Sequence, residues 1–275
     1  MDNKCRIGID VGGTFTDIVA VSDTGTVTFS KAASTPNDPS IGVMNAVERL
    51  ADELGINSET LLSKTESIVH GTTVATNALL ERKGAKTGLL TTLGHRDVLE
   101  MREGLKDDRY NMRLPAPAPL VPRFLRLGVR ERIKPDGRIH TKLDDTSLDE
   151  AINKLREEKV TSVAVCYLHA YKEPKHEQET KKILEAKLPG VSVSISSEVF
   201  PEIKEYERVS TTIVNAYVRP IVENYLNRLE ERLKNAGYKG SVLIILSHGG
   251  VAPIEEAIRL SAATVLSGPA GGVAG

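Results

Sequence analysis

The residues best suited to chemistry form a short segment near the N-terminus that is rich in glycine and threonine. Gly12 and Gly13 permit positive φ at no steric cost, so backbone N–H groups there can approach an anion closely. The hydroxyl groups of Thr14 and Thr16 add hydrogen-bond donors. The segment predicts a phosphate-binding loop, and the alternative is a tight hairpin that merely needs two glycines.

Two carboxylates, Asp10 and Asp17, flank this loop. A carboxylate beside a phosphate repels it unless a cation lies between the two. Asp10 is therefore a candidate for holding Mg²⁺, through a water molecule, at a catalytic centre.

The segments around the loop must position it. Apolar and β-branched runs at residues 5–11, 18–21 and 26–29 predict three strands, with a turn at 22–25. The loop therefore joins two strands, whereas the glycine-rich segment of a Rossmann or P-loop site opens a helix.

The pattern then alternates between helix and strand. It predicts a helix at 40–54, a buried strand at 67–69, a turn at 70–73, a helix ending near residue 82, and a strand at 86–91. Strands mixed with helices in this way predict an α/β layer.

A second group of candidates opens the predicted helix after residue 73. Free N–H groups at a helix start suit an anion, and the side chains of His70, Thr72 and Thr73 stand beside that start. Asn77 falls one turn further on and is a weaker candidate on the substrate side. An N-cap with a core histidine explains the same pattern equally well.

A third group follows the buried strand predicted at 242–246. Ser247, His248 and Gly249 come directly after it, at the carboxyl end of a strand, where open α/β sheets bind ligands. We place them on the substrate side. His248 could act as an acid, a base or a donor, or it could simply form a turn.

The middle of the chain differs in character. Residues 101–140 are rich in proline and predict a connector, and a β-α-β block near 162–196 predicts an inserted subdomain. A long apolar stripe from 209 to 233 predicts a helix containing Pro220. These features predict three regions, 1–100, 101–200 and 201–275. His169 and His176 have no partner that the sequence identifies.

Composition narrows the class of protein. The chain has 275 residues, with 36 Lys+Arg against 37 Asp+Glu. This balanced charge favours neither binding to a polyanion nor electrostatic attraction to a membrane surface. The absence of Trp and an aromatic content of only 4% disfavour nucleic-acid stacking platforms. Cys5 and Cys166 stand in apolar runs, which predicts a reduced cytoplasmic protein. No apolar run approaches membrane-spanning length.

Four motifs together resemble one family. They are the loop at 10–17, the segment at 70–81, the cluster around Glu205-Tyr206-Glu207-Arg208, and the glycine-rich segment at 266–272. The chain resembles the hydantoinase/oxoprolinase family, which includes N-methylhydantoinase A and acetone carboxylase β-subunits. This family is a branch of the superfamily of acetate and sugar kinases, heat-shock chaperones and actin.

The resemblance implies a ribonuclease H-like first lobe with an inserted α/β subdomain. It also implies ATP and Mg²⁺, with the loop glycines and threonines gripping phosphate together with Gly268, Gly271 and Gly272. The resemblance further implies a catalytic role for His70, Thr72 and Thr73, facing the phosphate or the substrate. Relatives commonly have Asn where this chain has His248. The family has a second lobe after the glycine-rich segment, so we expect the chain to hold half an ATP site, completed by that lobe or by a partner subunit.

The resemblance also implies a reaction. We expect an ATP-dependent hydrolase of cyclic amides such as hydantoins and 5-oxoproline, acting by phosphorylation of the amide oxygen. An alternative is a subunit of an ATP-dependent carboxylase of ketones such as acetone or acetophenone. An alternative of another class is a non-catalytic module that binds nucleotide or supports assembly.

Overall fold

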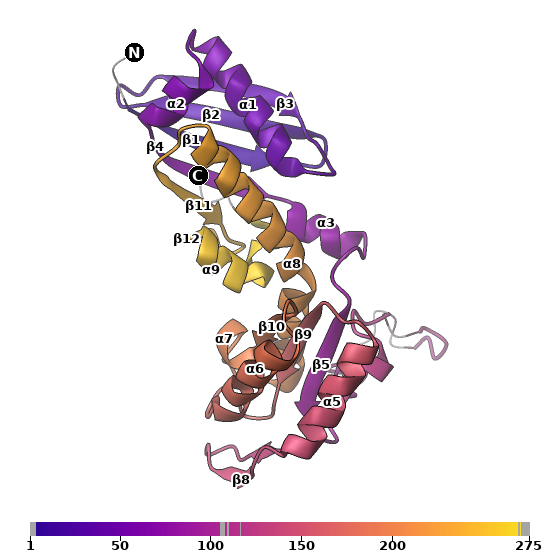
Figure 1. Cartoon of the computed structure of the whole chain (residues 1–275). Coiled ribbons are helices and arrows are strands. Elements are labelled where there is room, and N and C mark those ends of the chain that lie inside the picture. The colour runs from indigo at the N-terminus through magenta and orange to yellow at the C-terminus, as the bar shows by residue number, and fades with distance from the viewer. Residues whose placement is uncertain (1–3, 105–107, 109, 116, 269, 271–275) are drawn as a thin grey trace. The chain divides into compact units, whose positions relative to one another are not determined.

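The chain divides into two compact units (Figure 1). The computed structural model describes residues 4–104, 108, 110–115, 117–268 and 270. Unit 1 comprises Met1–Glu81 and Ile221–Gly275, and unit 2 comprises Arg82–Pro220. Unit 2 is therefore a continuous stretch of chain inserted into unit 1.

Unit 1 is built on a six-stranded sheet with the order β12-β11-β4-β1-β2-β3. Its first three strands form an antiparallel meander, and β4 and β11 lie parallel to β1. The strands are β1 (Cys5–Val11), β2 (Phe15–Ser22), β3 (Val27–Ala33), β4 (Thr65–Thr72), β11 (Ser241–Ile245) and β12 (Val251–Pro253).

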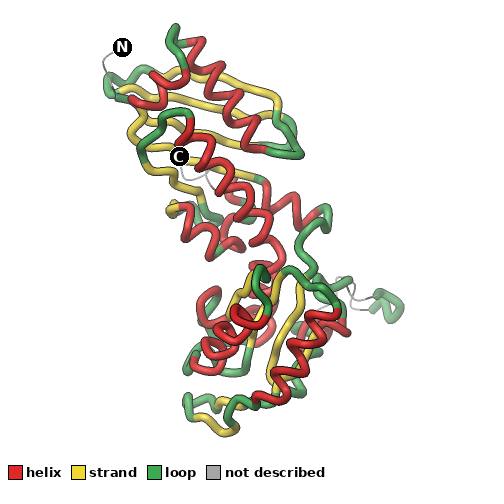
Figure 2. The backbone as a smooth tube through the Cα atoms, in the orientation of Figure 1, coloured by secondary structure: helices red, strands yellow, loops and turns green. Residues whose placement is uncertain are grey.

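Alternation fixes which side chains of the meander are buried. Ile7, Ile9 and Val11 of β1 are buried while the residues between them are not, as a strand with one face on the core requires. Figure 2 shows the strands and helices of this unit along the backbone trace. The helices are α1 (Pro39–Glu53), α2 (Ser58–Lys64), α3 (Val74–Leu80), α9 (Ile254–Arg259) and the 3-10 turn η2 (Ser261–Thr264).

Local signals set the start of α1. The Asp38 side chain accepts a hydrogen bond from Ser40 N, and proline occupies the first turn, where its missing N–H costs nothing. Val43, Val47 and Leu50 then form a fully buried stripe on one side of the helix. This helix packs on β2 and β3.

The strand order is that of a ribonuclease H-like layer, in which an antiparallel meander continues into parallel strands. The predicted fold class, α/β with an inserted α/β subdomain, is confirmed. Unit 2 enters between β4 and β11, which are neighbours in the sheet.

Unit 2 is built on a fully parallel four-stranded sheet with the order β10-β9-β5-β6. Its core is apolar and includes Leu89, Leu90, Val163 and Leu184. Its strands are β5 (Thr87–Thr92), β6 (Arg126–Val129), β9 (Ser162–Cys166), β10 (Ser192–Ile195) and the hairpin β7 (Arg132–Ile133) and β8 (Ile139–Thr141). Its helices are α4 (Val98–Met101), η1 (Arg123–Leu125), α5 (Asp145–Glu157), α6 (Lys175–Lys187) and α7 (Ser196–Val199).

The long predicted helix is present as α8 (Glu205–Asn235), with Pro220 inside it. The division between the two units falls at this proline. Among the described residues, no helix is both long enough and apolar enough to cross a membrane.

Two local predictions were wrong. The strand at 86–91 was expected in the first layer, but β5 belongs to unit 2, because its hydrogen-bond partners are β6 and β9. Residues 70–72 were expected to form a turn, but they continue strand β4, because they pair in register with the end of β1. The unit boundaries also differ from the expected divisions near residues 100 and 200.

Candidate functional site

The glycine loop connects β1 to β2, as expected. The two strands pair Asp10 with Asp17, and Gly12 N donates to Phe15 O at 3.0 Å to close the turn. Within the described residues, the backbone N–H groups of Gly13 and Thr14 donate no hydrogen bond. Two adjacent free N–H groups on an exposed loop form an arrangement that suits a phosphate oxygen.

The glycines of the loop do not adopt the backbone conformation that the sequence analysis predicted. Neither Gly12 nor Gly13 has positive φ. A Cβ at Gly12 would lie 3.2 Å from Phe15 O, so that position needs glycine for close approach. A Cβ at Gly13 would meet nothing within 4 Å, so close approach does not require glycine at that position.

The two threonines of the loop have different environments. Thr14 is exposed, so its hydroxyl can reach a ligand. Thr16 is fully buried, and its Oγ1 lies 3.1 Å from Ser34 Oγ, which itself donates to Gly12 O at 2.8 Å. The structure therefore places the Thr16 hydroxyl behind the loop, where it supports the turn.

Asp10 stands at the end of β1, beside two glycines from other segments. A Cβ at Gly71 would lie 3.0 Å from Asp10 Oδ1, and one at Gly268 would lie 3.4 Å from the same oxygen. Desolvation, followed by the charge of Asp17, raises the pKa of Asp10 even though the residue as a whole is exposed. Asp17 pairs with Lys31 at 3.0 Å, whereas Asp10 forms no ion pair with any described residue.

This environment fits a bound cation. A carboxylate that is partly desolvated and lacks a counter-charge is stabilised by a metal ion. The described residues contain no group of three His, Cys, Asp or Glu side chains that could hold a metal. An ion at Asp10 would therefore take most of its ligands from water and phosphate, which is how Mg²⁺ is commonly bound.

His70 lies inside the unit rather than beside the loop. Its side chain is fully buried, and its Nε2 lies 2.7 Å from the hydroxyl of Tyr225 on α8. Burial lowers the pKa of His70 from 6.5 to about 4, so the imidazole is neutral at pH 7. Its placement suits support of strand β4 rather than contact with a ligand.

Burial of neutral His70 makes stability depend on pH. The unfolded chain binds a proton at His70 below about pH 6.5, and the folded chain does so only near pH 4, so the free energy of unfolding falls as the pH decreases through this window. We expect a loss of about 2 kcal/mol between pH 7 and pH 5 from this residue. Urea unfolding of the wild type and of His70→Gln at both pH values measures it, and an equal pH dependence in both proteins would contradict the assignment.

The other residues of the second group tie α3 to the loop. Thr73 donates to Val11 O from both its N–H, at 3.2 Å, and its hydroxyl, at 3.1 Å. Asn77 Nδ2 donates to Thr73 Oγ1 at 3.3 Å, and Thr72 Oγ1 accepts from Val74 N at 3.3 Å. These polar groups therefore already have protein partners.

The C-terminal segment reaches the same place. Ser267 Oγ donates to Thr72 O at 3.1 Å, and Leu266 N donates to Thr76 Oγ1 at 2.9 Å. These bonds hold the segment that places Gly268 beside Asp10. Gly271 and Gly272 lie outside the described residues.

The third group forms the turn after β11. His248 is exposed, and its Nδ1 accepts a hydrogen bond from Gly250 N at 3.2 Å, while Gly249 has φ +83°. The His248 ring thus serves as a turn former. Because β1, β4 and β11 are parallel, this turn, Asp10 and Thr72 lie at one edge of the sheet.

Comparison with known proteins identifies the family. The model of the hydantoinase/oxoprolinase N-terminal region matches residues 6–188, and that of hydantoinase/oxoprolinase matches residues 208–275. The chain belongs to the hydantoinase/oxoprolinase family.

Individual members of this family resemble the chain over nearly its whole length. Caprolactamase subunit alpha of Pseudomonas jessenii is 40% identical over 96% of the chain. The crystal structure of an ATP-dependent caprolactamase from the same organism superposes with a TM-score of 0.87 at 39% identity over 96% of the chain. A nucleotide-free acetone carboxylase superposes with a TM-score of 0.89 at 28% identity over 98% of the chain.

The chain covers only part of each of these family members. It spans 38% of caprolactamase subunit alpha, 39% of the caprolactamase structure and 40% of the acetone carboxylase chain. The part that it does cover includes both units and the sheet edge at Asp10.

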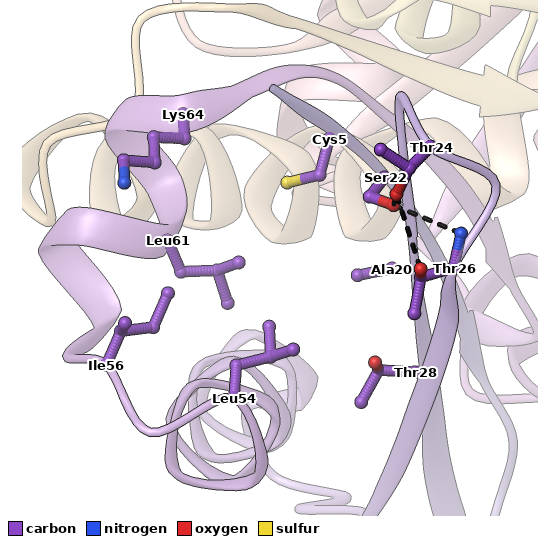
Figure 3. A pocket seen from close by; sticks show the side chains of 10 residues that line it. All are labelled: Cys5, Ala20, Ser22, Thr24, Thr26, Thr28, Leu54, Ile56, Leu61 and Lys64. Carbon is purple, nitrogen blue, oxygen red and sulfur yellow. Dashed lines mark hydrogen bonds between the residues drawn. The ribbon is translucent and has the colours of Figure 1, made fainter. Parts of the chain in front are cut away.

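A hollow at the opposite end of β1 differs from this edge (Figure 3). It has a volume of about 160 Å³, and its walls are mainly apolar side chains such as Leu54, Ile56 and Leu61, with Cys5 and several threonines. One cationic side chain, Lys64, also lines it, but it offers no carboxylate for a metal ion and no open glycine loop. The sheet edge at Asp10 is therefore the stronger candidate for a nucleotide-binding site.

Proposed function

We propose that this chain carries the phosphate-binding part of an ATP-dependent hydrolase of cyclic amides. The observation that supports it is the Asp10 carboxylate, which has no ion-pair partner among the described residues, beside a loop with two N–H groups that donate to none of those residues. The similarity to an ATP-dependent caprolactamase, at 39–40% identity, supports lactams as the substrate class. A second lobe or a partner subunit would complete the ATP site.

Each part of the loop has a proposed task. Mg-ATP would supply the phosphoryl group that activates the amide oxygen, so that water can open a ring that amide resonance protects. Asp10 holds the Mg²⁺ through water, and the N–H groups of Gly13 and Thr14 with the Thr14 hydroxyl bind phosphate oxygens. Thr16, Thr73 and His70 keep this edge rigid, which reduces the reorganisation needed at the moment of reaction.

A ketone carboxylase is the second candidate. The observation in its favour is the TM-score of 0.89 with acetone carboxylase, although the sequence identity is only 28%. In such a reaction the oxygen to be activated belongs to an enol, and the same loop would bind the same phosphates. The acetophenone carboxylase gamma subunit of Aromatoleum aromaticum is 36% identical to the chain, which is only slightly below the 40% of caprolactamase subunit alpha, so the lactam assignment is preferred by a small margin.

ATP consumption separates the candidates. The protein extended through the second lobe, with any partner subunit, should release inorganic phosphate when given caprolactam, 5-oxoproline or hydantoin, and should not respond to acetone or acetophenone with bicarbonate. The reverse pattern would assign a carboxylase. Mg-ATP binding without turnover of any substrate would leave only a nucleotide-binding module.

A further inference from the structure

Unit 2 contains a pocket that the proposed ATP reaction does not use. It has a volume of about 460 Å³, and the side chains that matter below are His95, Arg132, His169, Lys204, Glu205 and Glu207. His95 follows β5, Arg132 follows β6, and His169 follows β9. These three parallel strands end at one edge, which is where open α/β sheets bind ligands.

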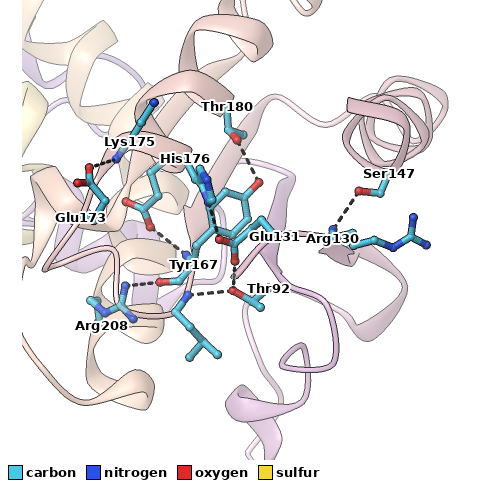
Figure 4. A network of polar contacts seen from close by, with 12 residues as sticks. Thr92, Arg130, Glu131, Ser147, Tyr167, Glu173, Lys175, His176, Thr180 and Arg208 are labelled. Atoms are coloured by element: carbon cyan, nitrogen blue, oxygen red, sulfur yellow. Dashed lines mark hydrogen bonds and ion pairs between the residues drawn. The ribbon is translucent and has the colours of Figure 1, made fainter. Parts of the chain in front are cut away.

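A buried polar network holds the walls of this pocket in place (Figure 4). Glu131 as a residue is only 3% exposed, and its carboxylate accepts a hydrogen bond from Thr92 Oγ1 and lies 2.8 Å from His176 Nδ1. Thr92 Oγ1 in turn accepts a hydrogen bond from Leu168 N at 2.9 Å. The pocket residues Arg132 and His169 are direct neighbours of two network members, so the network fixes their backbones.

The backbone of the pocket wall is strained. Arg102, His169 and Lys204 have φ of +52°, +58° and +85°, and all three line the pocket. They are half of the six non-glycine residues with positive φ that the described chain contains. Such residues gather at ligand sites, where the surrounding structure holds them.

The charges of the pocket leave two arginines, Arg102 and Arg132, and one carboxylate, Glu205, without an ion pair among the described residues. Lys204 pairs with Glu207 at 3.1 Å and with Glu103 at 3.8 Å. Neither the Arg132 guanidinium nor the Glu205 carboxylate forms an ion pair with any residue that the structure describes. Arg132 Nη1 lies 3.0 Å from His95 Nε2, so this bond orients the guanidinium while its other N–H groups stay available.

The two histidines add polarity without adding charge. Burial, followed by the charge of Arg132, lowers the pKa of His95, and burial is also the main cause of the lowered pKa of His169. Glu205 and Glu131 act in the opposite direction on both rings, and Arg208 lowers the pKa of His169 further. Both imidazoles are therefore neutral hydrogen-bonding groups at pH 7.

We propose that this pocket binds a small zwitterion, with a carboxylate on Arg132 and an ammonium group on Glu205. A guanidinium binds a carboxylate through paired N–H donors, and a free carboxylate accepts from an ammonium group. A simple anion would leave Glu205 without a partner, and a simple cation would leave Arg132 without one. Opening of a lactam yields such an amino acid, and that link alone rests on the proposed function.

Three ligands of equal chain length test the proposal. Calorimetry without nucleotide compares 5-aminopentanoate, pentanoate and pentylamine on the wild-type chain. We expect 5-aminopentanoate to bind about tenfold tighter than either of the others, because only it satisfies both charges. Arg132→Gln should remove its advantage over pentylamine, and Glu205→Gln its advantage over pentanoate.

Arg138→Gln is the matched control, because Arg138 is an exposed arginine of unit 2 that pairs with Asp136 outside the pocket. Its affinity for 5-aminopentanoate should equal that of the wild type. Glu205 is exposed, so its variant should stay folded even if the Arg132 variant loses stability on heating. Equal affinity for the three compounds, or no binding of 5-aminopentanoate at about 10 mM, would overturn the proposal. Since no ATP is present, either result leaves the proposed hydrolase reaction untouched.

Discussion

Asp10→Asn should lower the affinity for Mg-ATP by roughly 100-fold, which is about 3 kcal/mol, while leaving any weak binding of metal-free ATP nearly unchanged. Asp10 combines a raised pKa, a position against Gly71 and Gly268, and the lack of an ion pair with any described residue. An amide in its place keeps the shape but removes the charge that attracts the cation. Calorimetry with and without Mg²⁺, on the chain alone and on a form extended through the second lobe, measures this difference.

Asp23→Asn provides the control for the Asp10 variant. Asp23 is an exposed aspartate in the turn after β2, at the other end of the strand from the loop. Its replacement should leave Mg-ATP affinity within about twofold of the wild type. An equal loss of Mg-ATP affinity in both variants, or no loss in Asp10→Asn, would show that Asp10 does not hold the metal ion.

Arg208→Met should cost about 3–5 kcal/mol of the free energy of unfolding, because two buried acceptors lose a charged donor. Arg208 is 1% exposed, and its Nη1 donates to Tyr167 O at 2.7 Å and to Ser196 Oγ at 2.8 Å. The same Ser196 hydroxyl donates at 2.6 Å to Glu177, which is fully buried and also accepts from Tyr167 N at 2.9 Å. Loss of the guanidinium leaves the Tyr167 carbonyl and the Ser196 hydroxyl, both buried, without their charged donor.

The pKa of Glu177 reflects its burial and its hydrogen bonds. Burial raises it, although the hydrogen bonds from Ser196, Ser197 and Tyr167 act in the opposite direction. Urea unfolding at pH 7 measures the cost of Arg208→Met. Arg130→Met is the control, because the Arg130 side chain is 64% exposed and its ion pair with Asp144 should contribute less than about 1 kcal/mol. If the two midpoints shift equally, the buried network does not stabilise unit 2 in the way proposed.

The meander and its loop could be predicted from the sequence because their signals are local. Residues 5–29 alternate between β-branched runs and turn residues, and strands β1 to β3 are neighbours in both the chain and the sheet. The sheet to which β5 belongs could not be predicted in this way. Parallel partners are separated by whole helices, and a buried run such as Thr87–Thr92 fits either sheet equally well.

The sequence did contain a signal for the burial of Thr16 and His70. Thr16 shares a strand face with Ile18 and Ala20, and His70 shares one with Ile68, so the period of two marks both as buried. Their polarity suggested contact with a ligand, whereas the alternation correctly indicated that both side chains are buried.

The zwitterion pocket carried no comparable signal. Arg132, His169 and Glu205 stand in separate segments, and only the common edge of three parallel strands brings two of them together, with the start of α8 supplying the third. Single-residue patterns cannot reveal such a set, because nothing in the spacing of the three residues is regular.

The insertion of unit 2 between β4 and β11 also determines the order in which the protein can mature on the ribosome. Strands β1 to β4 emerge first, and unit 2 follows as one continuous stretch that can fold before synthesis ends. The parallel pairing of β11 with β4 joins Ser241 to Ser67, so the first sheet is completed only after unit 2 has been synthesised. Until β11 arrives, β4 presents an unpaired strand edge, and the nascent chain is most exposed to aggregation during that interval.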